Sequence, residues 1–297
     1  MKYVITGSLG HISKPVVNAL VKAGHEVVVI TSNKDRVKDI ESLGATAATG
    51  SVDDASFLKQ AFAGAGVVYT MVPPNFGTPD IKKHIEQVGK NYAAAIKGSS
   101  VKYIVNLSSV GAHLSKGAGP ISGLYNAEAA LNALPGVNIK HLRPAYFYNN
   151  LLSNVGLIKN MGIMGSNFSV TGNKFPIVDT ADIASVAAEE LLQLNFTGQS
   201  VRYIASDEVS TESIASAIGA AIGKTDLPWV AFTDEQAKDG MLQAGLPPDI
   251  ANNYVEMGQG INSGAVYEEY WKHQPPALGK TKLADFARVF TAAYKNS

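Results

Sequence analysis

The stretch VITGSLGHISKPVVNALVKAGHEVVVITSN, residues Val4–Asn33, decides the fold. The β-branched run Val4–Thr6 predicts a strand, and the apolar spacing over Pro15–Ala23 predicts a helix. The run Glu26–Ile30 is nearly all apolar, as in a parallel sheet that is covered on both faces. A glycine-containing turn, Gly7-Ser8-Leu9-Gly10, joins the first strand to the helix. This order of elements predicts the first unit of an α/β sheet.

The two glycines suit a turn that binds a phosphate. Gly7 permits a tight turn out of the strand, and Gly10 lets the backbone approach a pyrophosphate without a side chain in the way. Backbone amides at the start of the helix then face the anion. Ser13 stands where a third glycine is usual, and it is small enough to keep the helix close to the strand. The context predicts a dinucleotide site, with a structural turn in another α/β fold as the alternative.

The end of the second strand indicates which dinucleotide is bound. An acidic residue there would hold the 2′-hydroxyl of NAD, but Thr31-Ser32-Asn33 has none. Lys34 and Arg36 follow directly, which favours the 2′-phosphate of NADP. The alternative is that both cations are only solvated charges at the start of a helix.

The remaining sequence predicts a Rossmann-type, doubly wound parallel α/β sheet with a smaller C-terminal lobe. Predicted helices are Arg36–Leu43, Ser56–Ala63, Ile81–Ile96, Tyr125–Leu134, Asp182–Leu194 and Thr211–Ile222. Predicted strands are Thr46–Gly50, Val67–Val72, Tyr103–Leu107, Asn138–Leu142 and Ser200–Ala205. Residues 1–150 form the nucleotide-binding core, to which 179–205 return, and 151–178 with 206–297 form the lobe. Because crossovers are right-handed, the carboxyl ends of the strands line one crevice.

Composition excludes several classes of function. The 25 basic and 25 acidic residues of the 297 cancel, so neither nucleic acid nor a membrane surface is expected as partner. The absence of cysteine excludes disulfides and thiolate chemistry, and the six histidines show no metal-ligand spacing. No signal peptide pattern opens the chain. We therefore expect a soluble cytoplasmic protein with a small-molecule substrate and no metal.

Several segments together resemble the NmrA-like family of atypical short-chain dehydrogenase/reductases. They are VITGSLGHISKPVVNALVKAGHEVVVI, GATAATGSVDDASFLKQAFAGAGVVYTMVPP, YIVNLSSVGAH, LRPAYFYNN, VDTADIA and, near the end, LADFARVF. The resemblance implies a Rossmann core that binds NADP and a small C-terminal lobe. The family includes NADPH-dependent quinone reductases and ether-reductase-like enzymes, and also regulators that bind the dinucleotide without turning it over.

The resemblance also implies which residues contact the cofactor. It assigns the pyrophosphate to Gly7, Leu9, Gly10, His11 and Ile12, and the adenosine ribose to Ser32, Asn33 and Arg36. It assigns the adenine to Val52 and Asp53, and the nicotinamide ribose to Met71, Val72, Pro73 and Pro74. Pro144, Tyr146 and Phe147 resemble the segment near the nicotinamide and the substrate. The family often has an arginine in place of Ser32, so binding of the 2′-phosphate is expected either to be weaker or to fall to Lys34 and Arg36.

The candidate catalytic residues are Tyr125, Glu128 and His113. In the wider superfamily a serine, a tyrosine and a lysine four residues after the tyrosine assist hydride transfer, but here that position is Ala129. Tyr125 can still donate a proton, or be only a packed helix aromatic, and Glu128 can orient a ligand or only bind a loop amide. His113 can face the substrate, although a solvated loop histidine is the simpler interpretation.

Two classes of function remain open. The first is an NADPH-dependent oxidoreductase that passes hydride directly to a quinone or similar electrophile, which needs little acid catalysis. The second is a regulator that binds NADP, senses redox state and acts through a protein partner. An ether or double-bond reductase is a third possibility, but no lysine is found for it. The enzyme predicts an apolar pocket beside Pro73, Tyr125 and Tyr146, and the regulator predicts that side chains fill it.

Overall fold

The computed structural model describes all 297 residues and centres on a seven-stranded sheet with every strand parallel. In spatial order the strands are β10 (Gln199–Ile204), β6 (Asn138–Pro144), β5 (Tyr103–Leu107), β4 (Val67–Thr70), β1 (Lys2–Ile5), β2 (Glu26–Thr31) and β3 (Thr46–Thr49). The chain winds outward from β1 to β3 and then returns to β4 on the other side of β1. The direction of winding reverses there, which is where such sheets bind ligands. The predicted Rossmann-type fold is confirmed.

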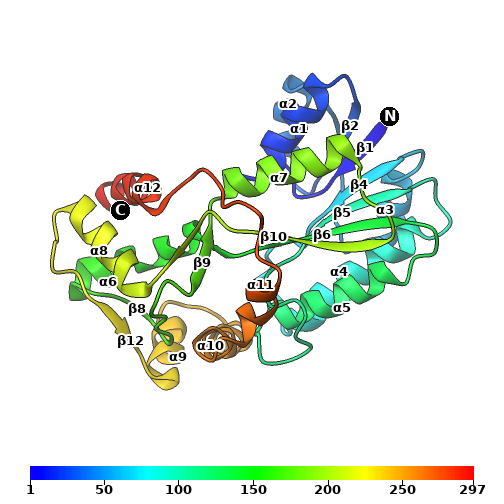
Figure 1. The fold of residues 1–297 in the computed structure, drawn as a ribbon. Coiled ribbons are helices and arrows are strands. Elements are labelled where there is room, and N and C mark those ends of the chain that lie inside the picture. The colour runs from blue at the N-terminus through cyan, green and yellow to red at the C-terminus, as the bar shows by residue number, and fades with distance from the viewer.

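Helices cover both faces of this sheet (Figure 1). On one face lie α3 (Ala55–Ala61), α4 (Ile81–Ile96) and α5 (Ile121–Asn132), and on the other lie α1 (Ser13–Lys22) and α7 (Thr180–Gln193), which pack together. A turn η1 (Lys34–Arg36) leads into the short α2 (Val37–Ser42). Helices α4 and α5 pack closely: a Cβ on Gly89 would lie only 2.5 Å from Ala127.

The element boundaries differ from the predicted ones where a polar or proline contact intervenes. The strand expected over Val67–Val72 ends at Thr70, because the amide of Met71 donates to the Thr6 hydroxyl instead of extending the ladder. Helix α5 begins a turn earlier than expected, after Pro120, whose fixed φ suits a helix start.

The lobe contains small strands that the sequence did not indicate, because strands this short have too few residues to show an alternation of apolar and polar side chains. A three-stranded sheet joins β11 (Asp207–Val209), β9 (Phe175–Val178) and β7 (Tyr146–Phe147), and β12 (Trp229–Ala231) pairs with β8 (Met164–Ser166). The lobe helices are η2 (Tyr148–Asn154), α6 (Val155–Met161), α8 (Thr211–Ile222), α9 (Asp234–Gln243), α10 (Pro248–Asn262), η3 (Ala265–Tyr267), α11 (Glu268–Lys272) and α12 (Leu283–Asn296). In Figure 1 the red α12 lies beside α8, at the far end of the lobe from β1.

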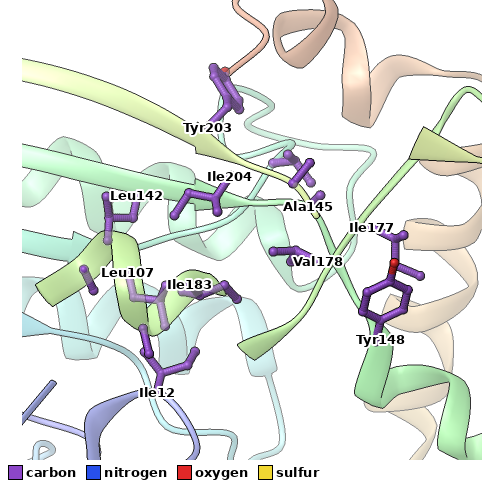
Figure 2. Packing of buried hydrophobic residues seen from close by; sticks show 14 of the residues in the cluster. Ile12, Leu107, Leu142, Ala145, Tyr148, Ile177, Val178, Ile183, Tyr203 and Ile204 are labelled. Carbon is purple, nitrogen blue, oxygen red and sulfur yellow. The ribbon is translucent and has the colours of Figure 1, made fainter. Parts of the chain in front are cut away.

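One buried cluster joins the core to the lobe (Figure 2). Ile12 at the start of α1, Leu107 from β5 and Ile183 from α7 belong to it, together with Tyr148 of η2 and Ile177 of β9. Continuous burial of this kind fixes the lobe over the carboxyl edge of the sheet. The predicted crevice would therefore lie between the sheet edge and the lobe.

Candidate active site

The glycine turn has the shape that a close approach of phosphate requires. Gly7 has φ +88°, and a Cβ there would lie 2.7 Å from Ser13 Oγ and 3.0 Å from Met71 Cγ. The next residue, Ser8, also has a positive φ of 53°. Its strain is offset by two hydrogen bonds to the end of β2, from its amide to Ile30 O (3.1 Å) and from its hydroxyl to Thr31 Oγ1 (3.0 Å).

The start of α1 is left available for an anion. No side chain caps its N-terminus, and Ser13 instead donates its hydroxyl to the Thr6 carbonyl at 3.1 Å. The side chain of Ile12 is buried in the core, as Figure 2 shows, so only its backbone can face the crevice. His11 and Gly10 are exposed. Uncapped amides beside a glycine turn fit a pyrophosphate.

Two cations, Lys34 and Arg36, follow the tip of β2, and the one carboxylate between them is that of Asp35. The Thr31 hydroxyl donates to Asn33 O at 3.2 Å, and Asn33 Oδ1 accepts from the amide of Asp35 at 2.8 Å, which starts η1. Arg36 is exposed and lies 3.7 Å from Asp39. Lys34 is exposed and forms no salt bridge, so its ammonium is free to meet a phosphate.

The loops after β3 and β4 complete this edge. Asp53 accepts from Ser51 Oγ at 3.1 Å and lies 3.7 Å from His84 Nδ1, but its side chain remains 57% exposed and can accept from an adenine amine. In the second loop Met71 is half-buried, and its sulfur would contact any side chain at Gly7. The predicted cofactor segments that follow the first four strands therefore lie together at the carboxyl edge of the sheet.

A pocket of about 210 Å³ opens beside this crevice. It lies between the loop after β4 and the starts of α4 and α5, and α10 of the lobe contributes one residue. Its apolar wall is made of Val72, Pro73, Pro74, Phe76, Ile81, Ile85, Pro120, Ile121 and Leu124. The polar side chains that line it are those of Asn75, His84, Ser109 and Tyr254. The expectation of an apolar pocket beside Pro73 agrees with this geometry, but Tyr125 and Tyr146 do not line it.

Tyr125 and Tyr146 lie outside the pocket, the first on the exposed surface of α5 and the second packed against aromatic rings. Tyr125 is 41% exposed on α5, and its neighbour Leu124 points to the pocket instead. Tyr146 lies in β7, and its ring packs against Phe168 and Phe175 at 6.0 and 5.1 Å between centroids. Burial raises the pKa of the Tyr146 hydroxyl well above its ordinary value. These contacts favour a role for Tyr146 in the lobe core.

Glu128 is buried in an ion pair. Its two carboxylate oxygens accept from Arg143 Nε at 3.0 Å and Arg143 Nη2 at 2.6 Å, and Arg143 also donates to the Tyr203 hydroxyl at 3.0 Å. Both carboxylate oxygens are therefore engaged by one guanidinium group. Glu128 is also absent from the pocket wall, so the geometry favours a positioning role within α5 and β6.

His113 is enclosed but has no hydrogen-bond partner on either ring nitrogen. Burial, followed by the charge of Arg143, lowers its pKa from the ordinary value of 6.5. It does not line the pocket, and neither do Pro144 and Phe147, of which Pro144 is buried at the end of β6. The catalytic role of His113 and the nicotinamide contacts of Pro144 and Phe147 stay predictions.

Comparison with known proteins decides the family. The sequence profile of the NmrA-like family matches residues 2–287. The chain belongs to this family. A curated NAD(P)H azoreductase from Xenophilus azovorans is 24% identical over 256 residues, covering 86% of this chain and 85% of that protein.

Two solved structures of reductases share the fold of this NmrA-like protein. An NADPH-dependent quinone oxidoreductase from Escherichia coli, complexed with NADPH, superposes with a TM-score of 0.79 at 18% identity, covering 96% of this chain and 98% of that one. A triphenylmethane reductase from Citrobacter sp. superposes with a TM-score of 0.79 at 18% identity, covering 98% of this chain and 100% of that one. At this level of identity both comparisons establish the fold.

Sequence reasoning missed several residues that shape the NmrA-like site. Ser8 and Thr6 fix the turn and the loop after β4, and His84 and Tyr254 line the pocket from α4 and α10. Ser8 lies within the glycine turn, so its place in the sequence could have indicated that it shapes the turn. Tyr254 had none, because its placement depends on the docking of α10.

The structure brings together no group of three or more His, Asp and Glu side chains able to hold a metal ion. None of its helices combines the length and apolar character needed to span a bilayer.

Proposed function

We propose that this protein is an NADPH-dependent oxidoreductase that transfers hydride directly to a small planar electrophile such as a quinone. The observation that carries the proposal is the apolar pocket beside the loop that is expected to contact the nicotinamide ribose. Its volume of about 210 Å³ suits one or two rings rather than a polymer or a peptide. The reductase relatives support the same class of chemistry.

The crevice fits NADPH through backbone shape and charge. The turn at Gly7 and Gly10 and the uncapped start of α1 would hold the pyrophosphate, and Lys34 with Arg36 would hold the 2′-phosphate. When bound, NADPH would supply the hydride. The apolar wall formed by Pro73 and Leu124 would exclude water from the acceptor ring.

Reduction of a quinone does not require a dedicated proton donor in the protein. Reduction of a quinone to a hydroquinone consumes one hydride and one proton in total, and solvent at the pocket mouth can deliver the proton. The Ser109 hydroxyl and the His84 imidazole line the pocket and can hydrogen-bond an acceptor oxygen. A direct transfer of this kind does not need the lysine that is missing after Tyr125.

The test is NADPH oxidation by the purified protein, followed at the nicotinamide absorbance. The acceptors are a panel of benzoquinones, naphthoquinones and an azo compound, and NADPH affinity is measured in parallel. Turnover with at least one quinone supports the proposal. Turnover with the azo compound alone keeps the reductase but replaces the acceptor class. Tight NADPH binding without turnover on any acceptor contradicts the enzyme and favours the redox-sensing regulator.

A further inference from the structure

Two consecutive residues of α4, Asn91 and Tyr92, reach the two loops that are expected to hold opposite ends of the cofactor. Both are buried, at 7% and 1% exposure, and both direct a polar atom to backbone outside their helix. A buried polar side chain that is paired with irregular backbone restricts that backbone to one conformation. Neither residue lines the pocket or belongs to a sequence motif for the cofactor.

Asn91 uses both of its amide hydrogens on the adenine loop. Nδ2 donates to Val52 O at 3.2 Å and to Asp53 O at 3.0 Å. Its Oδ1 accepts from Gln87 Nε2 at 2.9 Å, one helical turn earlier, which orients the amide group. The side chain is thus almost fully satisfied, and its two donors hold the backbone of the residues that resemble the adenine contacts.

Tyr92 acts in the same way on the loop after β4. Its hydroxyl donates to Met71 O at 2.7 Å, while the amide of Met71 donates to Thr6 Oγ1 at 2.9 Å. The Met71 residue is therefore held at its carbonyl and at its amide. The carbonyl of Thr6 in turn accepts from the hydroxyl of Ser13, the first residue of α1. Thr6 therefore contacts both this loop and the start of α1.

From this arrangement we propose that Asn91 and Tyr92 are positioning residues that shape the adenine and nicotinamide-ribose loops before the dinucleotide binds. The inference rests on the proposed use of NADPH, and not on the identity of the acceptor. A loop that is already ordered loses less conformational entropy on binding, so affinity is higher. Each residue serves its own half of the cofactor.

The experiment compares the full cofactor with its adenosine half. Dissociation constants for NADPH and for 2′,5′-ADP are measured by calorimetry with wild-type protein, Asn91→Ala and Tyr92→Phe. Both variants only remove atoms, so neither introduces a clash. Asn91→Ala is expected to weaken both ligands by about tenfold, because two hydrogen bonds to the adenine loop are lost. Tyr92→Phe is expected to weaken NADPH by about fivefold and to leave 2′,5′-ADP unchanged.

Tyr3→Phe is the matched control. Tyr3 is also buried, and its hydroxyl also donates to a distant backbone carbonyl, that of Leu191, at 3.0 Å. Its removal is expected to lower the melting temperature as Tyr92→Phe does, with both dissociation constants unchanged. If all three variants weaken both ligands equally, the effect is general destabilisation and the proposal is wrong.

Two further outcomes separate this inference from the proposed function. A wild-type protein that binds NADPH, with Asn91→Ala and Tyr92→Phe unchanged in both affinities, overturns only the positioning role. A wild-type protein that binds neither NADPH nor 2′,5′-ADP overturns both, whatever its variants do. Because the measurement is binding, the absence of a suitable acceptor in a turnover assay affects neither conclusion.

Discussion

The two walls of the crevice are built in different ways. On the wall formed by β1, β2 and β3, each expected cofactor contact lies in a short turn directly after a strand. The pocket wall instead gathers residues from two core helices, two loops and α10, from Val72 to Tyr254. The first wall is local in sequence and presents mainly backbone, whereas the second depends on how distant elements pack.

This difference explains which residues tolerate change. A turn such as Gly7-Ser8 is restricted by its own backbone angles, so a substitution acts there directly. The pocket wall is restricted by its support, in which the ion pair of Glu128 and Arg143 joins α5 to β6. We expect stability to depend most on the supports of the second wall, and cofactor affinity on the turns of the first.

The largest effect is expected for Glu128→Leu. Arg143 would then be buried without its carboxylate, and the free energy of unfolding should fall by about 3–5 kcal/mol. Urea unfolding measures this loss. The double variant Glu128→Leu with Arg143→Met removes both charges and should recover most of the stability. If the single variant is as stable as wild type, Glu128 is not a support, and its catalytic role regains interest.

Gly7→Ala tests the first wall. Its Cβ would meet Ser13 and Met71 in addition to the strain of a positive φ, so NADPH affinity should fall by about a hundredfold. Gly24→Ala is the control, because Gly24 has φ +79° with nothing within 4 Å of its Cβ. It should lose about 1 kcal/mol of stability and no affinity. Equal losses of affinity in both would mean that the turn does not contact the cofactor.

Leu124→Phe tests the pocket wall. The larger ring would fill part of the pocket, so kcat/KM for a quinone should fall by about thirtyfold, while NADPH affinity stays within about twofold. Tyr125→Phe changes the exposed neighbouring residue and should alter kcat/KM by less than about threefold. A loss of about a hundredfold or more in Tyr125→Phe would instead identify Tyr125 as the proton donor.

The sequence could predict most of the first wall and little of the second, for a physical reason. A glycine with positive φ, or a strand tip without a carboxylate, can be recognised from a few consecutive residues of the sequence. By contrast, Leu124 and Tyr125 are adjacent in sequence, and only the packing of α5 on α4 decides which one lines the pocket. The position of Tyr146 likewise depends on tertiary structure, because its strand β7 pairs with β9.

The cations at the tip of β2 give a smaller effect. In a variant with both Lys34→Ala and Arg36→Ala, NADPH affinity should fall by about tenfold, because the two exposed cations would each contribute a modest charge contact. NADH affinity should not change, since it has no 2′-phosphate. Lys38→Ala removes an equal charge from the exposed face of α2 and serves as control. An equal loss for NADPH and NADH would contradict the assignment of the phosphate.

The smallest effect comes from a buried histidine beneath the second wall. His141 accepts from Asn106 Nδ2 at its Nδ1 (3.0 Å) and donates from Nε2 to Asn132 Oδ1 (2.9 Å), so it is neutral in the fold. Burial lowers its pKa, the nearby Glu128 carboxylate opposes this shift, and Arg143 adds to it. The folded pKa thus lies below the unfolded value of 6.5, and stability that is full above 6.5 is lost as the pH falls toward the folded pKa.

His141→Gln should remove this pH dependence. Between pH 7 and pH 5 the wild type is expected to lose more of its unfolding free energy than the variant does, although the variant starts from a lower stability. His113, whose pKa is also lowered by burial, contributes equally to both proteins and cancels in the difference. The unfolding free energy of both proteins is measured by urea unfolding at pH 7, 6 and 5. If it changes with pH equally in both, His141 accepts a proton in the folded state. The support of the second wall would then be more adaptable than its buried, fully bonded geometry implies.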